Sequence, residues 1–178
     1  MKENIWFTFK ARIQAHTRLE WLDLHSQLLL VWYAILGAIL SIVTIRYPQA
    51  LGTNTDILAT VLSVALLAVS LSLANRDFRG RALAMRVNYR GLQRLHAEID
   101  KDSGATLQQV TCYHDLLAQS ENHRDIDDLI FRVRNSATLE SRRPNSGEVV
   151  YAYIWLALRF VVTLALYGLP LLVAYLLK

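Results

Sequence analysis

Residues 57–74 read ILATVLSVALLAVSLSLA and contain no charged side chain. In a helix, which rises about 1.5 Å per residue, this stretch is about 27 Å long and nearly crosses the ~30 Å hydrocarbon core of a bilayer. The polar residues Asn75, Arg76 and Asp77 end it. A soluble domain has no need for an apolar run of this length, so the stretch predicts a transmembrane helix.

Two further apolar segments have the same property. Residues 27–45 carry no charge, and residues 149–177 carry only Arg159. Because residues 160–177 are long enough to span alone, Arg159 is expected at the membrane interface, and Pro170 is expected to kink the helix. The predicted fold is an all-α integral membrane protein with three transmembrane helices and a cytoplasmic helical insert between the second and the third. The expected parts are an N-terminal amphipathic helix (1–26), a transmembrane hairpin (27–75), the helical insert (76–148) and a C-terminal transmembrane helix (149–178).

The distribution of Lys and Arg predicts the orientation. Four lie before residue 27 and twelve in residues 76–149, whereas the loop 47–56 has none. Since cytoplasmic loops are enriched in Lys and Arg, the N-terminus and the insert are expected in the cytoplasm and the C-terminus outside. Arg76 and Arg79 are expected to face lipid headgroups. Twelve basic residues in the insert meet eleven acidic ones, so direct nucleic-acid binding is not expected.

Residues 1–25 have apolar side chains at helical spacing, among them Trp6, Phe9 and Ile13. Their mixture of acidic and basic residues does not resemble a cleaved signal peptide, so the first span is expected to remain as an anchor. One interpretation is a helix that packs on the protein or lies on the membrane surface. The other is a toxin-like segment that inserts into the membrane on activation.

The second span is expected to continue unbroken into the insert, as one helix from Ile57 to Asp100. Beyond Arg76, apolar or weakly polar residues recur in alternating steps of four and three, which is typical of a helix that packs along one face. This seam consists of Phe78, Ala82, Met85, Tyr89, Leu92, His96 and Ile99. Burial on the seam should lower the pKa of His96.

Two shorter helices are expected after the seam. Asp102, Ser103 and Gly104 end the long helix, with Ser103 as a cap for the next one, over about 105–119. A second short helix is expected to begin with an acidic first turn around Asp125, where the helix dipole favours negative charge. Residues 135–147 are polar and are expected to form a linker into the third span.

No residue pattern points to catalysis. The best candidates for a metal site are a group of histidines and aspartates, namely His114, His123, Asp125, Asp127 and Asp128. Their spacing matches no standard ligand set, so no metal and no cofactor is expected. The single cysteine, Cys112, has no evident base and cannot form an internal disulfide. The chain is therefore not expected to be an enzyme, and an enzyme acting on lipid is the weakest of the function hypotheses.

Small residues line the first two spans at spacings that let helix backbones approach closely in lipid. The first span has Gly37 and Ser41, and the second has Ser63, Ser70 and Ala74. One interpretation is a helix-contact face, within or between protomers. The other is a narrow polar path through an oligomer.

Several of these features together resemble the SLATT family, and most of all its fifth subfamily. They are the two closely spaced spans, the basic stretch RGRALAMRVNYRGLQRLHAEID (79–100) and the motif SENHRDID (120–127), which precedes a third apolar segment. The resemblance covers nearly the whole chain. It implies that Tyr89, Leu92, Leu95 and Ile99 form a helix core, and that Asn122, His123 and Asp125 shape the next helix start. It supplies no catalytic residue.

The resemblance also implies a function. SLATT proteins are small membrane effectors associated with bacterial nucleotide-signalling defence systems, and the fifth subfamily is often encoded beside a reverse transcriptase. The expected function is an antiviral, abortive-infection effector that oligomerises and permeabilises or depolarises the inner membrane when triggered. The alternative is a passive membrane anchor or adaptor that recruits a cytosolic partner. The expected partners are membrane lipid, further copies of the chain, and a reverse transcriptase or nucleotidyltransferase encoded nearby.

Overall fold

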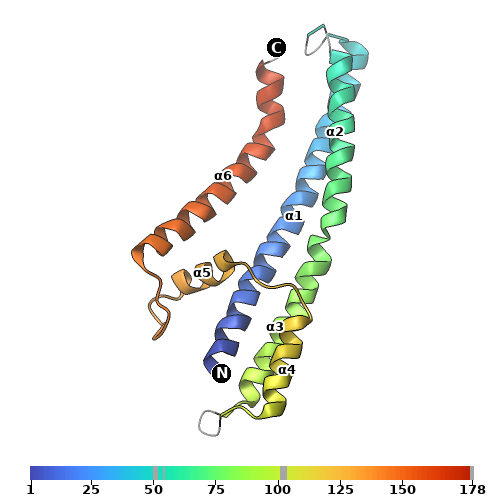
Figure 1. Ribbon diagram of the computed structural model, residues 1–178. Helices are drawn as coiled ribbons and strands as arrows, with labels where there is room; N and C mark the ends of the chain where they lie inside the picture. The colour runs from blue at the N-terminus through green and yellow to red at the C-terminus, as the bar shows by residue number, and fades with distance from the viewer. Residues whose placement is uncertain (50–51, 54, 101–103, 177–178) are drawn as a thin grey trace. The chain divides into compact units, whose positions relative to one another are not determined.

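The computed structural model describes residues 1–49, 52–53, 55–100 and 104–176. These residues form six α-helices, labelled in Figure 1: α1 (Lys2–Arg46), α2 (Thr55–Arg76), α3 (Phe78–Glu98), α4 (Leu107–Ala118), α5 (Asp125–Arg134) and α6 (Ser146–Leu176). Within the described residues, three helical segments, in α1, α2 and α6, are long and apolar enough to cross a membrane. The expectation of an all-α fold with three helices apolar enough to cross a membrane is therefore confirmed for the described residues.

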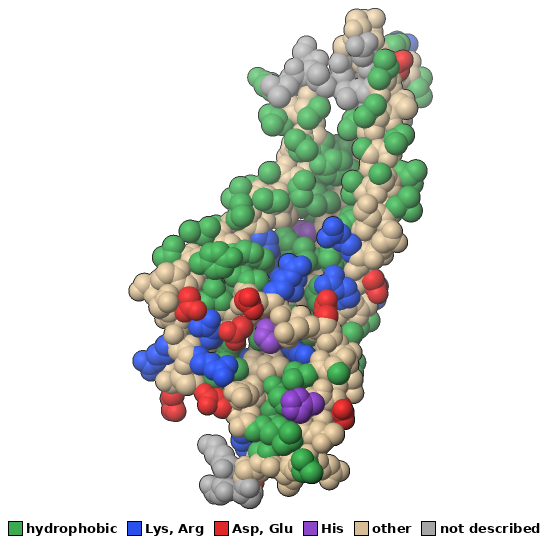
Figure 2. Space-filling model, in the orientation of Figure 1, with side chains coloured by type: hydrophobic (Ala, Val, Ile, Leu, Met, Phe, Trp, Pro, Cys, Tyr) green, Lys and Arg blue, Asp and Glu red, His purple; other side chains and the backbone are tan. Residues whose placement is uncertain are grey.

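The chain folds into two compact units. The polar unit comprises residues 1–22 and 78–156, and the apolar unit comprises residues 23–77 and 157–178. Charged side chains gather on the polar unit, whereas hydrophobic side chains cover the surface of the apolar helices (Figure 2). The helix α1 contributes its N-terminal half to the polar unit and its C-terminal half to the apolar unit.

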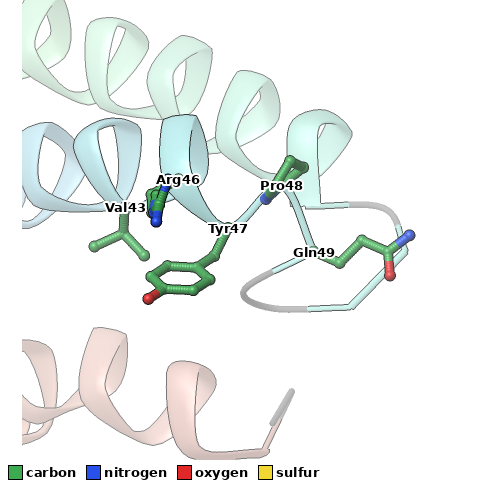
Figure 3. Close-up of a pocket in the computed structure, with 5 residues that line it drawn as sticks. All are labelled: Val43, Arg46, Tyr47, Pro48 and Gln49. Carbon is green, nitrogen blue, oxygen red and sulfur yellow. The ribbon is translucent and has the colours of Figure 1, made fainter.

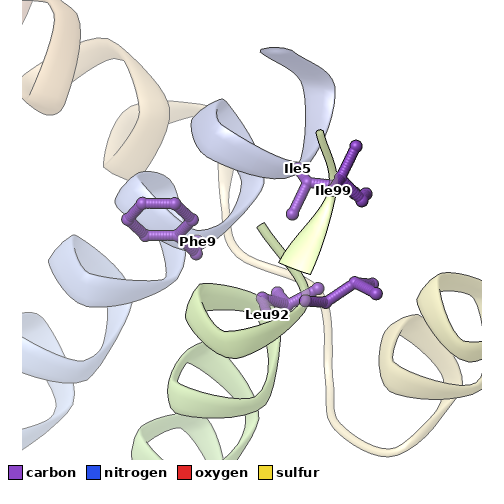
Figure 4. Close-up of a cluster of buried hydrophobic side chains, with 5 residues drawn as sticks. Ile5, Phe9, Leu92 and Ile99 are labelled. Carbon is purple, nitrogen blue, oxygen red and sulfur yellow. The ribbon is translucent and has the colours of Figure 1, made fainter. Parts of the chain in front are cut away.

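The N-terminal half of α1 lies at the centre of the polar unit, antiparallel to α3. Lys2 donates a hydrogen bond to the carbonyl of Ile99, and His16 contacts the carbonyl of Ala82. The start of α1 therefore lies beside the end of α3, and the two helices run in opposite directions. Side chains of both helices form the main core cluster, which consists of Ile5, Phe9, Leu92, Leu95 and Ile99 (Figure 4).

The opposite side of the same helix is also covered. Phe7 packs with Phe131 of α5 and with Leu139, and Trp6 contacts this cluster with its ring edge. Nine residues of α1 between Ile5 and Leu19 are buried. Burial on this scale stabilises a helix through packing and leaves little apolar surface for a membrane. The structure therefore favours the packing interpretation of residues 1–25.

The predicted continuous helix from Ile57 to Asp100 is interrupted at one residue, because α2 ends at Arg76 and α3 begins at Phe78. Asp77 separates them in the left-handed region, with φ +40°. Aspartate is one of the few residues other than glycine that adopts this conformation, since its short side chain can hydrogen-bond to nearby backbone. The break thus falls at the polar triplet that ends the apolar run.

The start of α4 also differs from the prediction. Thr106, and not Ser103, is its N-cap: Thr106 and Gln109 each accept a hydrogen bond from the backbone N–H of the other. Ser103 itself lies outside the described residues. By contrast, α5 begins at Asp125 as expected, with Asp125, Asp127 and Asp128 in its first turn.

The first turns of α6 belong to the polar unit. Ala152 is 1% exposed and packs on α5 at Ile126 and Ile130, and Trp155 joins the same cluster. Glu148 reinforces this contact with an ion pair of 2.9 Å to Arg132 of α5. The apolar unit therefore receives α6 only from residue 157 onward.

Helices α3 and α4 approach closely at a glycine of α3. A Cβ added at Gly91 would lie 2.7 Å from Cδ2 of Leu116. We expect Gly91→Ala to be tolerated, because a leucine side chain can shift and alanine favours the helix by about 1 kcal/mol. Gly91→Leu should lower stability by about 1–3 kcal/mol through overpacking. Unfolding of the purified protein checks this, and Leu116→Ala should restore part of the loss in the Gly91→Leu variant only.

Candidate functional site

The histidines and aspartates singled out in the sequence do not form a metal-binding cluster within the described residues. Among the described residues, no three His, Cys, Asp or Glu side chains gather closely enough to hold a metal ion. Two of the aspartates singled out in the sequence are instead bound to arginines: Asp127 pairs with Arg18 and Asp128 with Arg132.

Two surface pockets lie among the described residues. Cys112 is an exposed free thiol in a groove on α4, and no histidine lines the described part of that groove. The other pocket lies at the end of α1, where it is lined by Val43, Arg46, Tyr47, Pro48 and Gln49 (Figure 3). Asp115 lines the same groove as Cys112, so that groove holds a thiol and a carboxylate.

A buried ion pair joins α1 to α5. Arg18 binds Asp127 through two hydrogen bonds, from Nε to Oδ1 at 2.8 Å and from Nη2 to Oδ2 at 3.0 Å. The two side chains are only 6% and 1% exposed. Asp127 also accepts from the backbone N–H of Arg124, so it closes the start of α5 as well. This carboxylate therefore fixes the SENHRDID motif to the N-terminal helix.

A second buried arginine joins α1 to α3 and α4. Arg12 is 1% exposed and donates to Oδ1 of Asn88, to the Ser120 hydroxyl and to the carbonyls of Leu116 and Leu117. All of these acceptors are neutral, and its Nε has no partner among the described residues. Burial lowers the pKa of Arg12, and this effect is partly opposed by Tyr113. Burying a guanidinium without a counter-charge costs free energy. Its N–H groups therefore need hydrogen-bond acceptors, which the four neutral oxygens provide.

Two histidines of the polar unit have lowered pKa values. The pKa of His96 is lowered by burial and by the nearby charges of Lys2 and Lys10, as the seam position predicted. The pKa of His123 is also lowered, again mainly by burial, although three nearby aspartates act in the opposite direction. The Nδ1 atom of His123 is buried and has no partner among the described residues.

These shifts predict a pH dependence of stability. A histidine whose pKa is lower in the folded state binds a proton more readily in the unfolded state. Protonation at low pH therefore stabilises the unfolded state relative to the folded state. We expect the free energy of unfolding to be highest above the ordinary histidine pKa of about 6.5. It should decline as the pH falls from there through the lowered pKa values of His96 and His123. Melting of the purified protein between pH 7.5 and 5.5 checks this. A His96→Phe/His123→Leu double variant should show a flatter dependence, and an equal slope would contradict the assignment.

The predicted seam residues are buried or half-buried. Ala82, Met85, Leu92 and Ile99 are buried, and Phe78, Tyr89 and His96 are half-buried. Asn88 and Leu95 are buried as well, so the packed face of α3 is rotated toward them. Leu95 was expected in the core on the resemblance alone, and Asn88 was not expected there.

The small residues of the spans lie on exposed surface of the protomer. Gly37, Ser41, Ser63 and Ala74 are exposed, and Ser70 is half-buried. Among the described residues, no heavy atom would come within 4 Å of a Cβ at Gly37. The hydroxyls of Ser41 and Ser63 bond to carbonyls of their own helices. This surface is therefore open to lipid or to another protomer.

The three arginines expected at the membrane interface differ in their exposure to solvent. Arg76 and Arg79 are exposed, whereas Arg159 is half-buried. Arg159 lies near the start of the part of α6 that belongs to the apolar unit.

Sequence reasoning missed the buried arginines, although a signal was present. Continuing from Ile5 and Phe9 in steps of three and four reaches Arg12, His16 and Leu19, all of them buried. The seam of the N-terminal helix therefore runs directly through Arg12, whereas Arg18 lies beside it. A charge on a packed seam indicates a specific buried partner.

The sequence matches a known protein family. Residues 1–177 match the SMODS and SLOG-associating 2TM effector domain family 5. No curated protein and no solved structure gives a significant match. Since the match covers nearly the whole chain, and the fold has the apolar helices such a domain requires, the chain belongs to this family of membrane effector domains, the fifth SLATT subfamily.

Proposed function

We propose that the protein oligomerises to permeabilise or depolarise the bacterial inner membrane when a partner or a nucleotide signal triggers it. The family gives the coarse role, a membrane effector in defence. The finer proposal rests on one observation: the spanning windows of the three apolar helices have none of their residues buried inside the protomer. Such helices need lipid or further copies of themselves as neighbours.

Oligomerisation follows from the small number of helices. Three spans cannot enclose a channel and remain close-packed, so a conducting unit requires several protomers. The exposed small residues supply a surface for that assembly, because Gly37 and Ser63 let a neighbouring backbone approach closely. The alternative use of the same surface is as the polar lining of the path.

The charge distribution supports an orientation with the polar unit in the cytoplasm. Four Lys and Arg residues before residue 27 and twelve in 76–149 contrast with none in 47–56. A cytosolic trigger, such as a reverse transcriptase or nucleotidyltransferase encoded nearby, would then act on the polar unit. Helix α1 offers the route to the membrane, because it is the core of that unit and continues into the first span.

A passive anchor or adaptor is the second candidate function. It is favoured by α3, whose Arg86, Arg90 and Arg94 are exposed and form no ion pair within the described residues. Arginines four residues apart lie on one face of a helix and could bind an acidic partner.

Induced expression in bacteria that carry a membrane-potential dye separates the two candidates. An effector should depolarise the cells within minutes of production, or of co-production with its genetic neighbours, and before growth stops. An adaptor should reach the membrane and bind its partner without any change in dye signal. Intact potential at full expression, with and without the neighbouring genes, would overturn the pore proposal.

A further inference from the structure

Helix α6 contains a proline within its apolar stretch. Pro170 has no N–H, so the carbonyl of Leu166, four residues earlier, receives no helical hydrogen bond. The kink at a proline also opens the same side of the helix near the following carbonyl, that of Tyr167. In hydrocarbon no water can replace these bonds, so a proline is tolerated only where a neighbour supplies donors.

Two consecutive residues of α1 supply those donors. The Tyr33 hydroxyl donates to the Leu166 carbonyl at 2.9 Å, and Nε1 of Trp32 donates to the Tyr167 carbonyl at 3.0 Å. All of these residues belong to the apolar unit. The indole N–H can only donate, and a phenol that donates to a carbonyl loses no apolar contact of its ring. Two donors therefore meet the two carbonyls that the proline affects.

We infer that Trp32 and Tyr33 form a lock that holds α6 on α1 at Pro170. The lock assigns α6 a fixed place beside the first span of the same protomer, although the family description counts only two transmembrane segments. His25 reinforces the contact, because its Nδ1 lies 3.4 Å from the hydroxyl of Tyr167.

The test is a double-mutant cycle on the purified full-length protein in detergent. Tyr33→Phe removes only the hydroxyl and should lower the melting midpoint by about 2–4 °C. In a Pro170→Ala background, the backbone N–H of the new alanine can donate to the Leu166 carbonyl within α6. The loss in melting midpoint caused by Tyr33→Phe should then be less than half of its value in the wild type. Equal losses in both backgrounds would refute the lock.

A matched control keeps the test decisive even if Pro170→Ala fails to fold. Tyr175 is an exposed tyrosine of the same helix, at 78% exposure. Tyr175→Phe should leave the melting midpoint unchanged, and Trp32→Phe should lower it at least as much as Tyr33→Phe. If Tyr33→Phe is no more destabilising than Tyr175→Phe, the lock does not exist.

A functional consequence rests on the proposed depolarising activity. If the lock belongs to the resting protomer, weakening it should lower the inducer level at which cells depolarise, and Tyr175→Phe should not. If the double-mutant cycle supports the lock but the inducer level needed for depolarisation does not change, the lock exists and has no role in activation. Absence of depolarisation in every variant, wild type included, would refute the proposed function, while the melting cycle still decides the lock.

Discussion

Replacing Asp127 by Asn is expected to destabilise the polar unit by about 3–5 kcal/mol. The substitution keeps the size of the side chain but leaves the Arg18 guanidinium buried without a counter-charge. Removing one partner of a buried pair is far more costly than the pair itself is stabilising, because the remaining ion cannot regain its hydration. Thermal unfolding and the loss of amide protection in α5 measure the effect.

The chain provides its own control for this prediction. Arg81 binds Glu121 with the same two-bond geometry, at 3.0 and 2.8 Å, but those side chains are 34% and 40% exposed. Glu121→Gln should therefore cost less than about 1 kcal/mol. The apolar pair Arg18→Met/Asp127→Leu should recover most of the stability lost in Asp127→Asn. If Asp127→Asn costs no more than Glu121→Gln, burial of the pair does not govern its strength.

Replacing Ser63 or Ser70 by Leu is expected to abolish depolarisation, whereas replacing either by Ala should preserve most of it. Leucine would separate neighbouring helices or fill the path, whichever use this surface has. Alanine stays small and removes only a hydroxyl, which is worth about 0.6 kcal/mol in contacts between membrane helices. For Ser63 that hydroxyl bonds the carbonyl of Ala59 in its own helix, at 2.9 Å. Dye signal and cell survival after induction measure the difference.

Expression level and membrane insertion of each variant must be matched to the wild type. Leucine variants that insert normally and still depolarise would remove this surface from the mechanism. The remaining candidate would then be the N-terminal helix around Trp6, Phe9 and Ile13. Because Phe9 is only 6% exposed, that route would first require the core of the polar unit to open.

The sequence alone determined the class of the fold and the position of the spans. A charge-free run such as residues 57–74 has one stable environment, and its length fixes that environment without reference to any other part of the chain. The acidic first turn at Asp125 is local in the same sense, because a helix dipole acts within one turn. The loss of a helical hydrogen bond in α6 could be expected for the same reason, since Pro170 lacks its own N–H.

Only the tertiary structure decided which partners the polar groups find. Arg18 and Asp127 are 109 residues apart in sequence, and Trp32 is 135 residues from Tyr167. The local sequence pattern identifies a hydrogen-bond donor or a charged residue but not its partner. Many arrangements of helices satisfy the same periodicity. The N-terminal helix illustrates this: its spacing predicted an apolar face, and only the surrounding helices made Arg12 and Arg18 part of the core. The position of a buried charge depends on where every neighbouring oxygen lies, and the fold as a whole sets those positions.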